Sequence, residues 1–302
     1  MFKSKNSMSR ALVRRETTAG YLFLLPSLFF FVTFVLYPMF LCIYTSFFDS
    51  NMGKNAVDVF VGLGNYKELF RDKLFLGALR NTVIIVVVAV PTVCAFSLWV
   101  ATAIYDMKPA LTSAFRCIFY LPVVTGSVAV TVVWKWMYNS RYGVFNYLFK
   151  SLGIIDQNIN WLGDARFALW CIILILFTTS VGQPIVLYVS ALGNVDHSLV
   201  EAAQVDGANR RQVFWKIKWA QIMPTTLYIL IITTINSFQC FALIQLLTSG
   251  GPTHSTDTIM YYIYYTAFKL YRYGYGNAMG VVLMIIIAVL SAVQFKLGQQ
   301  SD

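Results

Sequence analysis

Six stretches of the sequence are apolar and long enough to cross a lipid bilayer as helices. A bilayer core about 30 Å thick is spanned by about 20 helical residues. The stretches are residues 20–47, 81–103, 117–137, 167–192, 224–247 and 276–295. None alternates polar and apolar residues as a barrel strand does, and a helix pairs its own backbone groups inside lipid. The sequence therefore predicts an all-α, polytopic membrane protein with six transmembrane helices.

The charge distribution favours one orientation of these spans. Hydrophobic residues make up 58% of the chain and charged residues only 12%, against about 25% in an average soluble domain. The net charge of +10 does not indicate a nucleic-acid partner, because the basic residues cluster only briefly at the N-terminus. That cluster comprises Lys3, Lys5, Arg10, Arg14 and Arg15. Basic residues beside a span favour the cytoplasm, so we expect a cytoplasmic N-terminus.

These spans predict the organisation of the chain. We expect a cytoplasmic basic segment at 1–19, a first transmembrane helix at 20–47 and an extracytoplasmic segment at 48–80. A five-helix core at 81–297 would include a cytoplasmic loop at 193–223, and residues 298–302 would form a cytoplasmic tail. The first apolar run has no signal-peptide cleavage pattern, so we expect it to be retained as a span.

Several functional classes lack their usual sequence signals. The five cysteines lie in apolar stretches without a CxxC pair, and the two histidines form no HExxH motif, so no metal site is expected. No GxSxG motif or intramembrane carboxylate pair indicates an enzyme. All thirteen acidic residues lie in the predicted loops or tails. Their placement makes an ion-coupled secondary transporter the less favoured alternative.

Prolines lie within or at the ends of the predicted spans. They are Pro26, Pro38, Pro91, Pro122, Pro184 and Pro224. Each removes a backbone donor, which bends a helix or interrupts it. Simple bending is the favoured explanation of any single proline, but several together are of interest because interrupted spans are typical of transporters.

The loop at 193–223 is unexpectedly polar and patterned for two short helices. Ser198 to Glu201 has the spacing of a capping box, and Asn209 to Gln212 repeats the device. Gly207 would supply the turn between them. The first helix carries small residues, which suits docking in a groove on another protein.

The same segment resembles a known family. "EAAQVDGANRRQVFWKI" is similar to the EAA loop of binding-protein-dependent ABC importer permeases. "FVGLGNYKELF" and "LTSGGPTHSTDT" resemble MalF/UgpA-type permeases of carbohydrate importers, and the likeness covers about residues 18–297. It implies the ABC type I importer permease fold. Trp219 and Ala220 stand where the family usually has Leu-Pro, which predicts a kink displaced toward Pro224.

The resemblance implies a set of partners in a prokaryotic cell membrane. The coupling residues would be Glu201, Ala202, Ala203, Asp206, Gly207 and Ile217. They would dock on one of two ATPase subunits or domains, and a MalG/UgpE-like second permease and an extracytoplasmic solute-binding protein would complete the system. The chain has no G-x-x-x-x-G-K-[ST] motif, so we expect ATP and Mg to be bound by the ATPase rather than by this chain.

Uncharged polar residues in the fourth and fifth spans are the predicted substrate path. They are Thr178, Gly182, Gln183, Ile185, Asn236, Ser237, Gln239 and Cys240. The resemblance implies sugar contacts at all of these except Gln183 and Gln239, which lie beside them. The alternative is that the polar groups only join helices inside the membrane. We therefore expect a permease subunit of an ATP-driven sugar importer, with a permease for another solute as the alternative.

Overall fold

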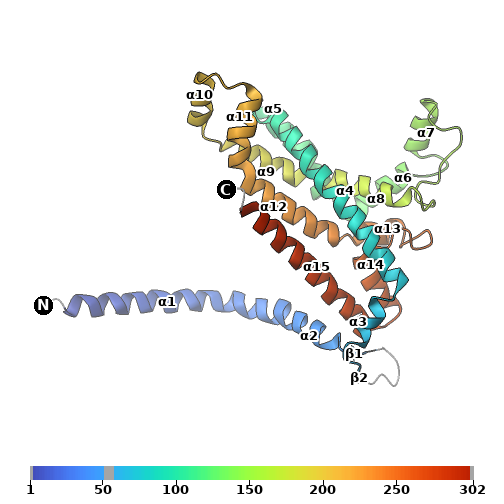
Figure 1. Ribbon diagram of the computed structural model, residues 1–302, viewed down its shortest axis with the longest axis horizontal. Helices are drawn as coiled ribbons and strands as arrows, with labels where there is room; N and C mark the ends of the chain where they lie inside the picture. Colours follow the sequence, from blue (N-terminus) through green and yellow to red (C-terminus); the bar gives the residue numbers. More distant parts are fainter. Residues whose placement is uncertain (1–2, 51–57, 300–302) are drawn as a thin grey trace.

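The structure is a computed structural model in which residues 3–50 and 58–299 are described. It is a bundle of helices with one short pair of strands (Figure 1). The helices of the first half are α1 (Lys3–Phe31), α2 (Tyr37–Thr45), α3 (Gly64–Leu69), α4 (Lys73–Ile104), α5 (Pro109–Val124), α6 (Ser127–Met137) and α7 (Val144–Ser151). Those of the second half are α8 (Ala168–Ser180), α9 (Gly182–Gly193), α10 (His197–Val205), α11 (Arg210–Val213), α12 (Trp219–Phe238), α13 (Ala242–Leu247), α14 (Ile259–Tyr264) and α15 (Tyr273–Gln299).

The elements separate toward two sides of the molecule. Figure 1 places the start of α1, the end of α15 and the α10–α11 pair toward one side, and α3, α7 and α14 toward the other. Because both ends of the described chain lie toward the same side, this arrangement agrees with an even number of membrane crossings. The side chains of the basic N-terminal cluster and the tail residues 300–302 lie outside the described part of the chain.

The first span projects from the bundle. A π-helical turn at Val32–Leu36 joins α1 to α2, and the candidate span Glu16–Thr45 has none of its most apolar window buried. Only α2 packs closely on the core: Asn277 Nδ2 on α15 donates to Thr45 Oγ1 at 2.7 Å. The strands β1 (Phe48–Asp49) and β2 (Val59–Phe60) follow as an antiparallel pair, with Phe48 opposite Phe60.

The core lies where α4, α9 and α12 pack together, and α15 packs on α12. Valine, isoleucine and leucine side chains fill the core, because each of these helices has one apolar face that packs against its neighbours. Val93, Ile185, Leu192 and Ile222 are among its fully enclosed members. The glycines at 276 and 280 serve packing inside this chain. A Cβ on Gly276 would lie 3.0 Å from the Cβ of Ala267.

The third span differs from its prediction. Residues 117–137 were expected to form one helix, but α5 and α6 meet at a 95° bend. Thr125 and Gly126 have extended backbone dihedral angles, with ψ of 125° and 142°, and Pro122 lacks the N–H that would continue the ladder of α5. The described part of the chain thus has five helices long enough to cross a membrane, or six if the bent pair counts as one span.

The fifth span is interrupted, while several prolines leave their helices unbroken. The fourth span, Ala168–Gly193, runs through α8 and α9 with only Val181 between them, and the fifth is broken at residues 239–241, between α12 and α13. Pro91 and Pro224 lie inside continuous helices. The entry to the fifth span carries a π-helical turn at Phe214–Lys218, which precedes Pro224.

Candidate coupling loop and transport cavity

Helix α10 begins two residues before the position that the sequence indicated. Asp196, not Ser198, is the N-cap: its backbone is extended, and Asp196 Oδ1 accepts a hydrogen bond from Ser198 N at 2.9 Å. The Ser198 capping box is therefore wrong, because Ser198 already lies inside the helix and donates its hydroxyl to Asp196 Oδ1 at 2.7 Å. These hydrogen bonds from the Ser198 side chain and backbone hold the pKa of Asp196 below its ordinary value.

The second predicted cap and the turn are confirmed. Asn209 Oδ1 accepts from Gln212 N at 2.9 Å, and Gln212 Oε1 accepts from Asn209 N at 2.8 Å, which completes a capping box. Gly207 has a φ of +82°, in the left-handed region that a glycine adopts without steric cost. The cap of α11 and the glycine turn thus define two short helices, α10 and α11, in this loop.

The coupling residues predicted from the sequence form an outward surface. Glu201, Ala202, Asp206 and Gly207 are exposed, while Ala203 and Ile217 are half-buried. Helix α10 has no buried residue, and it exposes Leu199 at 50% and Val205 at 88%. Apolar side chains exposed on a short projecting helix are typical of a surface that a partner covers.

The loop is attached to the core by contacts that the sequence analysis missed. Lys218 Nζ donates to the Tyr105 hydroxyl and lies 4.5 Å from the centre of its ring. Burial raises the pKa of Tyr105 above its ordinary value. Asp196 N also donates to Gln221 Oε1 at 3.1 Å. The sequence feature that could have indicated this contact is Lys218, a basic residue that lies among aromatic residues close to the membrane.

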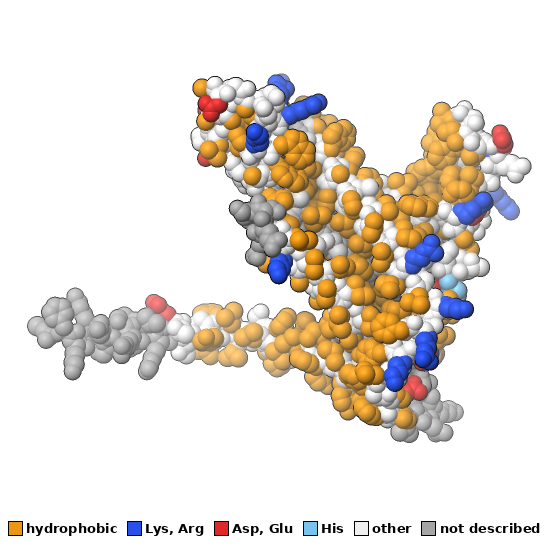
Figure 2. Space-filling view, viewed as in Figure 1, with side chains coloured by type: hydrophobic (Ala, Val, Ile, Leu, Met, Phe, Trp, Pro, Cys, Tyr) orange, Lys and Arg blue, Asp and Glu red, His pale blue; other side chains and the backbone are white. Residues whose placement is uncertain are grey.

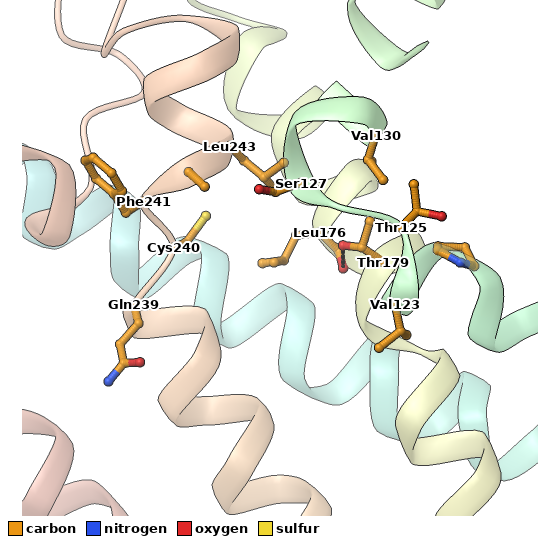
Figure 3. Close-up of a pocket in the computed structure, with 12 residues that line it drawn as sticks. Val123, Thr125, Ser127, Val130, Leu176, Thr179, Gln239, Cys240, Phe241 and Leu243 are labelled. Carbon is orange, nitrogen blue, oxygen red and sulfur yellow. Dashed lines mark hydrogen bonds between the residues drawn. The ribbon is translucent and has the colours of Figure 1, made fainter. Parts of the chain in front are cut away.

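A cavity of about 320 Å³ lies where the broken spans meet (Figure 3). The bend between α5 and α6 contributes Thr125 and Ser127, and α8 contributes Thr179. The break after α12 contributes Gln239 and Cys240. In Figure 3 Ser127, Thr179 and Cys240 surround the central space, while the amide of Gln239 points away from it.

The predicted substrate-path residues separate into three groups. Gln239 and Cys240 line this cavity, and Thr178 lines a neighbouring one of about 280 Å³. Gln183 and Asn236 are exposed at other places on the surface. Gly182, Ile185 and Ser237 are buried inside the chain.

Gly182 is buried because α9 passes very close to α5. A Cβ at this position would lie 2.4 Å from the backbone oxygen of Phe119. The sequence analysis missed three cavity residues, Thr125, Ser127 and Thr179. It treated the third span as one continuous helix, so it did not place Thr125 and Ser127 at a bend beside the fourth span. Pro122 and Gly126 are the residues that could have indicated this bend. Within residues 3–50 and 58–299 no group of three or more metal-ligating side chains is found.

Long apolar helices, interrupted spans around a cavity, and a capped helix pair projecting at one end together define a membrane subunit of a transport system. The chain belongs to the family described as the binding-protein-dependent transport system inner membrane component, which matches residues 21–299. The family resemblance read from the EAA segment is thereby confirmed, as is the ABC importer permease fold.

Relatives match over nearly their whole length. The lactose transport system permease protein LacF of Rhizobium radiobacter is 33% identical over 288 residues, covering 94% of this chain and 95% of LacF. The multiple sugar-binding transport system permease protein MsmF of Streptococcus mutans is 32% identical, covering 94% of this chain and 96% of MsmF. A chain of a bacterial alginate ABC transporter, crystallised with an alginate pentasaccharide-bound periplasmic protein, has the same fold. Its TM-score is 0.80 at 23% identity, with 93% of each chain covered.

Proposed function

We propose that this chain is the permease subunit of an ATP-driven, binding-protein-dependent sugar importer. The observation that carries the proposal is the exposed, capped α10–α11 pair at one end of a bundle whose broken spans enclose a cavity. Its similarity to LacF and MsmF over the full chain supports a sugar as the substrate.

The coupling role falls to the exposed face of α10 and the turn after it. Glu201, Ala202, Ala203, Asp206, Gly207 and Ile217 would contact a separate ATPase, which would bind ATP and Mg. Because Lys218 holds the base of this loop against Tyr105, a movement of α10 would be transmitted to the end of α4. The loop would lie in the cytoplasm together with the N-terminus, and a second permease subunit and an extracytoplasmic solute-binding protein would complete the system.

The substrate would pass the cavity at the helix breaks. Its polar lining comes from the hydroxyls of Thr125, Ser127 and Thr179, with Gln239 and Cys240 beside them, and none of its twelve lining residues is Asp, Glu, Lys, Arg or His. Uncharged donors and acceptors suit the hydroxyls of a neutral sugar, and about 320 Å³ lies within the usual range of ligand pockets.

A pair of glycine substitutions tests the coupling role. Gly207 and Gly153 both have positive φ, +82° and +67°, and a Cβ on either would meet no atom within 4 Å. Alanine at each position should therefore cost about the same, roughly 1–2 kcal/mol of backbone strain. We expect Gly207→Ala to lose sugar uptake and sugar-stimulated ATP hydrolysis in proteoliposomes, with normal abundance, and Gly153→Ala to retain both. Equal uptake by the two variants would show that the turn does not serve coupling.

A second pair tests the cavity. Thr179 Oγ1 donates to the Ile175 oxygen at 3.0 Å, which leaves its lone pairs for a ligand, and Thr92 donates similarly to Val88 but lies outside the cavity. Thr179→Val should raise the half-saturating sugar concentration by the value of one hydrogen bond, about 0.5–1.5 kcal/mol, or roughly two- to twelvefold. Thr92→Val should leave it unchanged. If both variants transport like the wild type, the sugar takes another route.

A further inference from the structure

An aromatic groove lies between α7 and the first turns of α8, at the side of the molecule opposite α10. It encloses about 190 Å³, and its walls include Phe145, Phe149, Trp161, Phe167, Trp170 and Leu174. The polar atoms nearest to it are already paired: Trp161 Nε1 donates to Asn146 Oδ1 at 3.0 Å, and the Tyr138 hydroxyl donates to the Cys171 oxygen at 3.3 Å. A sugar would find no hydrogen-bond partner here, so the groove suits an apolar ligand.

The groove is held open by its own scaffold. Asn146 is 2% exposed, and it accepts from Ile159 N at 3.1 Å and donates to Ile159 O at 2.9 Å, which fixes the loop against α7. The rings support one another: Phe149 and Trp161 lie 5.5 Å apart between ring centres, and Trp161 and Phe167 lie 5.7 Å apart. A ligand would therefore bind a preformed site and would not have to order it.

The groove opens toward the surface of a transmembrane span. Trp170 and Leu174 belong to the fourth span, Ala168–Gly193, and are 55% and 41% exposed. They lie in the first two turns of α8, at the end where the span leaves the membrane. Tryptophan side chains concentrate at this depth, where hydrocarbon meets the lipid headgroups. An acyl chain can thus pass from the bilayer into the groove without crossing water.

Basic residues are in excess in the segment that forms the groove. Between residues 135 and 170 the chain has four basic side chains, all exposed, and only two acidic ones. The basic residues are Lys135, Arg141, Lys150 and Arg166. The Arg166 guanidinium lies 5.5 Å from the ring centre of Phe167, a wall of the groove, and is paired with Asp164 at 2.7 Å. In Figure 2 the hydrophobic side chains over α7 border Lys and Arg side chains.

We propose that this groove binds an anionic phospholipid. One acyl chain lies among the aromatic rings, and the phosphate lies against the basic residues at the rim. The apolar walls suit the acyl chain, because the polar groups of Trp161 and Tyr138 are already paired. The excess of basic residues in the same segment suits the phosphate. A helix of a neighbouring subunit would use the apolar walls but would leave the basic rim without a partner.

Lipid retention by the assembled transporter tests the proposal. The complex is purified in the presence of phosphatidylglycerol or phosphatidylcholine with identical acyl chains, and bound lipid is counted by native mass spectrometry. We expect the wild type to retain phosphatidylglycerol in preference. Leu174→Trp, which fills the groove, should release one tightly bound lipid per copy of this chain, whereas Leu297→Trp, at an exposed site on α15, should not.

The headgroup is tested separately by removing charge. Arg166→Gln and Lys150→Gln should each lower the affinity for phosphatidylglycerol about fivefold, the value of one cation near an anionic surface, and should leave phosphatidylcholine unaffected. Lys269→Gln is the matched control, because Lys269 is exposed but lies outside the 135–170 segment. Retention of both lipids without preference would overturn the anionic part of the proposal.

A crosslinking measurement on the wild type tests the same site without depending on whether the variants fold. Phosphatidylglycerol with a photoreactive group on its acyl chain should crosslink to peptides that contain Phe149, Trp170 or Leu174. Crosslinks that avoid these peptides, or identical lipid counts for Leu174→Trp and Leu297→Trp, would overturn the site. A protein crosslink from position 174 to a neighbouring subunit in place of lipid would assign the groove to that subunit.

Discussion

Replacing Gly182 by alanine should loosen the packing of α9 against α5. The added Cβ would lie 2.4 Å from the Phe119 oxygen, 2.9 Å from Val123 Cγ2 and 3.0 Å from Tyr120 Cα, and two of these atoms belong to backbone. Because real Cβ contacts under 3.0 Å are essentially absent, the two helices must separate by more than half an ångström. Overpacking of this kind costs about 1–3 kcal/mol.

Gly193, the last residue of the same helix, is the matched control. A Cβ there would meet no atom within 4 Å, so Gly193→Ala should leave the free energy of unfolding unchanged or raise it by up to about 1 kcal/mol. The assay is denaturant unfolding of the purified transporter in nanodiscs, together with sugar uptake. We expect lower stability and lower uptake for Gly182→Ala alone.

Two outcomes would refute this reasoning. Equal stability of the two variants would show that α5 and α9 are not in tight contact. Unchanged stability with a raised half-saturating sugar concentration would instead support the role in the substrate path that was predicted for Gly182 from the sequence.

Three further substitutions test the helix caps and the α3–α15 side of the bundle. Asn209→Ala should cost about 1 kcal/mol of α11 stability and speed amide exchange at Arg210–Val213, whereas Ser198→Ala should change α10 less, because Ser198 is not its cap. Burial raises the pKa of Asp72, but hydrogen bonds from the Tyr262 and Tyr275 hydroxyls, each 2.8 Å, outweigh it and lower the pKa overall. The stability that this depressed pKa contributes is present above the ordinary aspartate pKa, about 3.9, and is lost as the pH falls through the lowered value. Thermal unfolding should therefore show this acid loss in the wild type and a smaller one in Asp72→Asn; identical pH profiles would contradict it.

The membrane spans could be predicted because hydropathy depends only on which residues are near one another in the chain. The same property explains the error in the third span. A window average over residues 117–137 cannot register that Thr125 and Gly126 adopt extended dihedral angles, although Pro122 and Gly126 hinted at a break.

The coupling loop was largely predictable because its caps are local. Asn209 and Gln212 are three residues apart, and the side chain of each accepts a hydrogen bond from the backbone N–H of the other. The spacing of these two residue types therefore predicts the cap from the sequence alone. Asp196 and Ser198 are both good cap residues, and only the backbone conformation decides between them. The cavity was less predictable, because its lining comes from the bend between α5 and α6 and from the break after α12, and neither can be located from the spacing of residues within one span.

The projecting first helix imposes an order on the assembly of the molecule. It is synthesised first, yet the α2 side chain that anchors it, Thr45, bonds to Asn277, which follows 232 residues later. At a synthesis rate of about 5–20 residues per second, the partner on α15 appears roughly 10 to 50 s after Thr45. Through that interval the helix has no packing site on α15, and lipid and its flanking charges must hold it in place. A charge reversal in the N-terminal flank would thus act during synthesis, before the bundle exists to correct it.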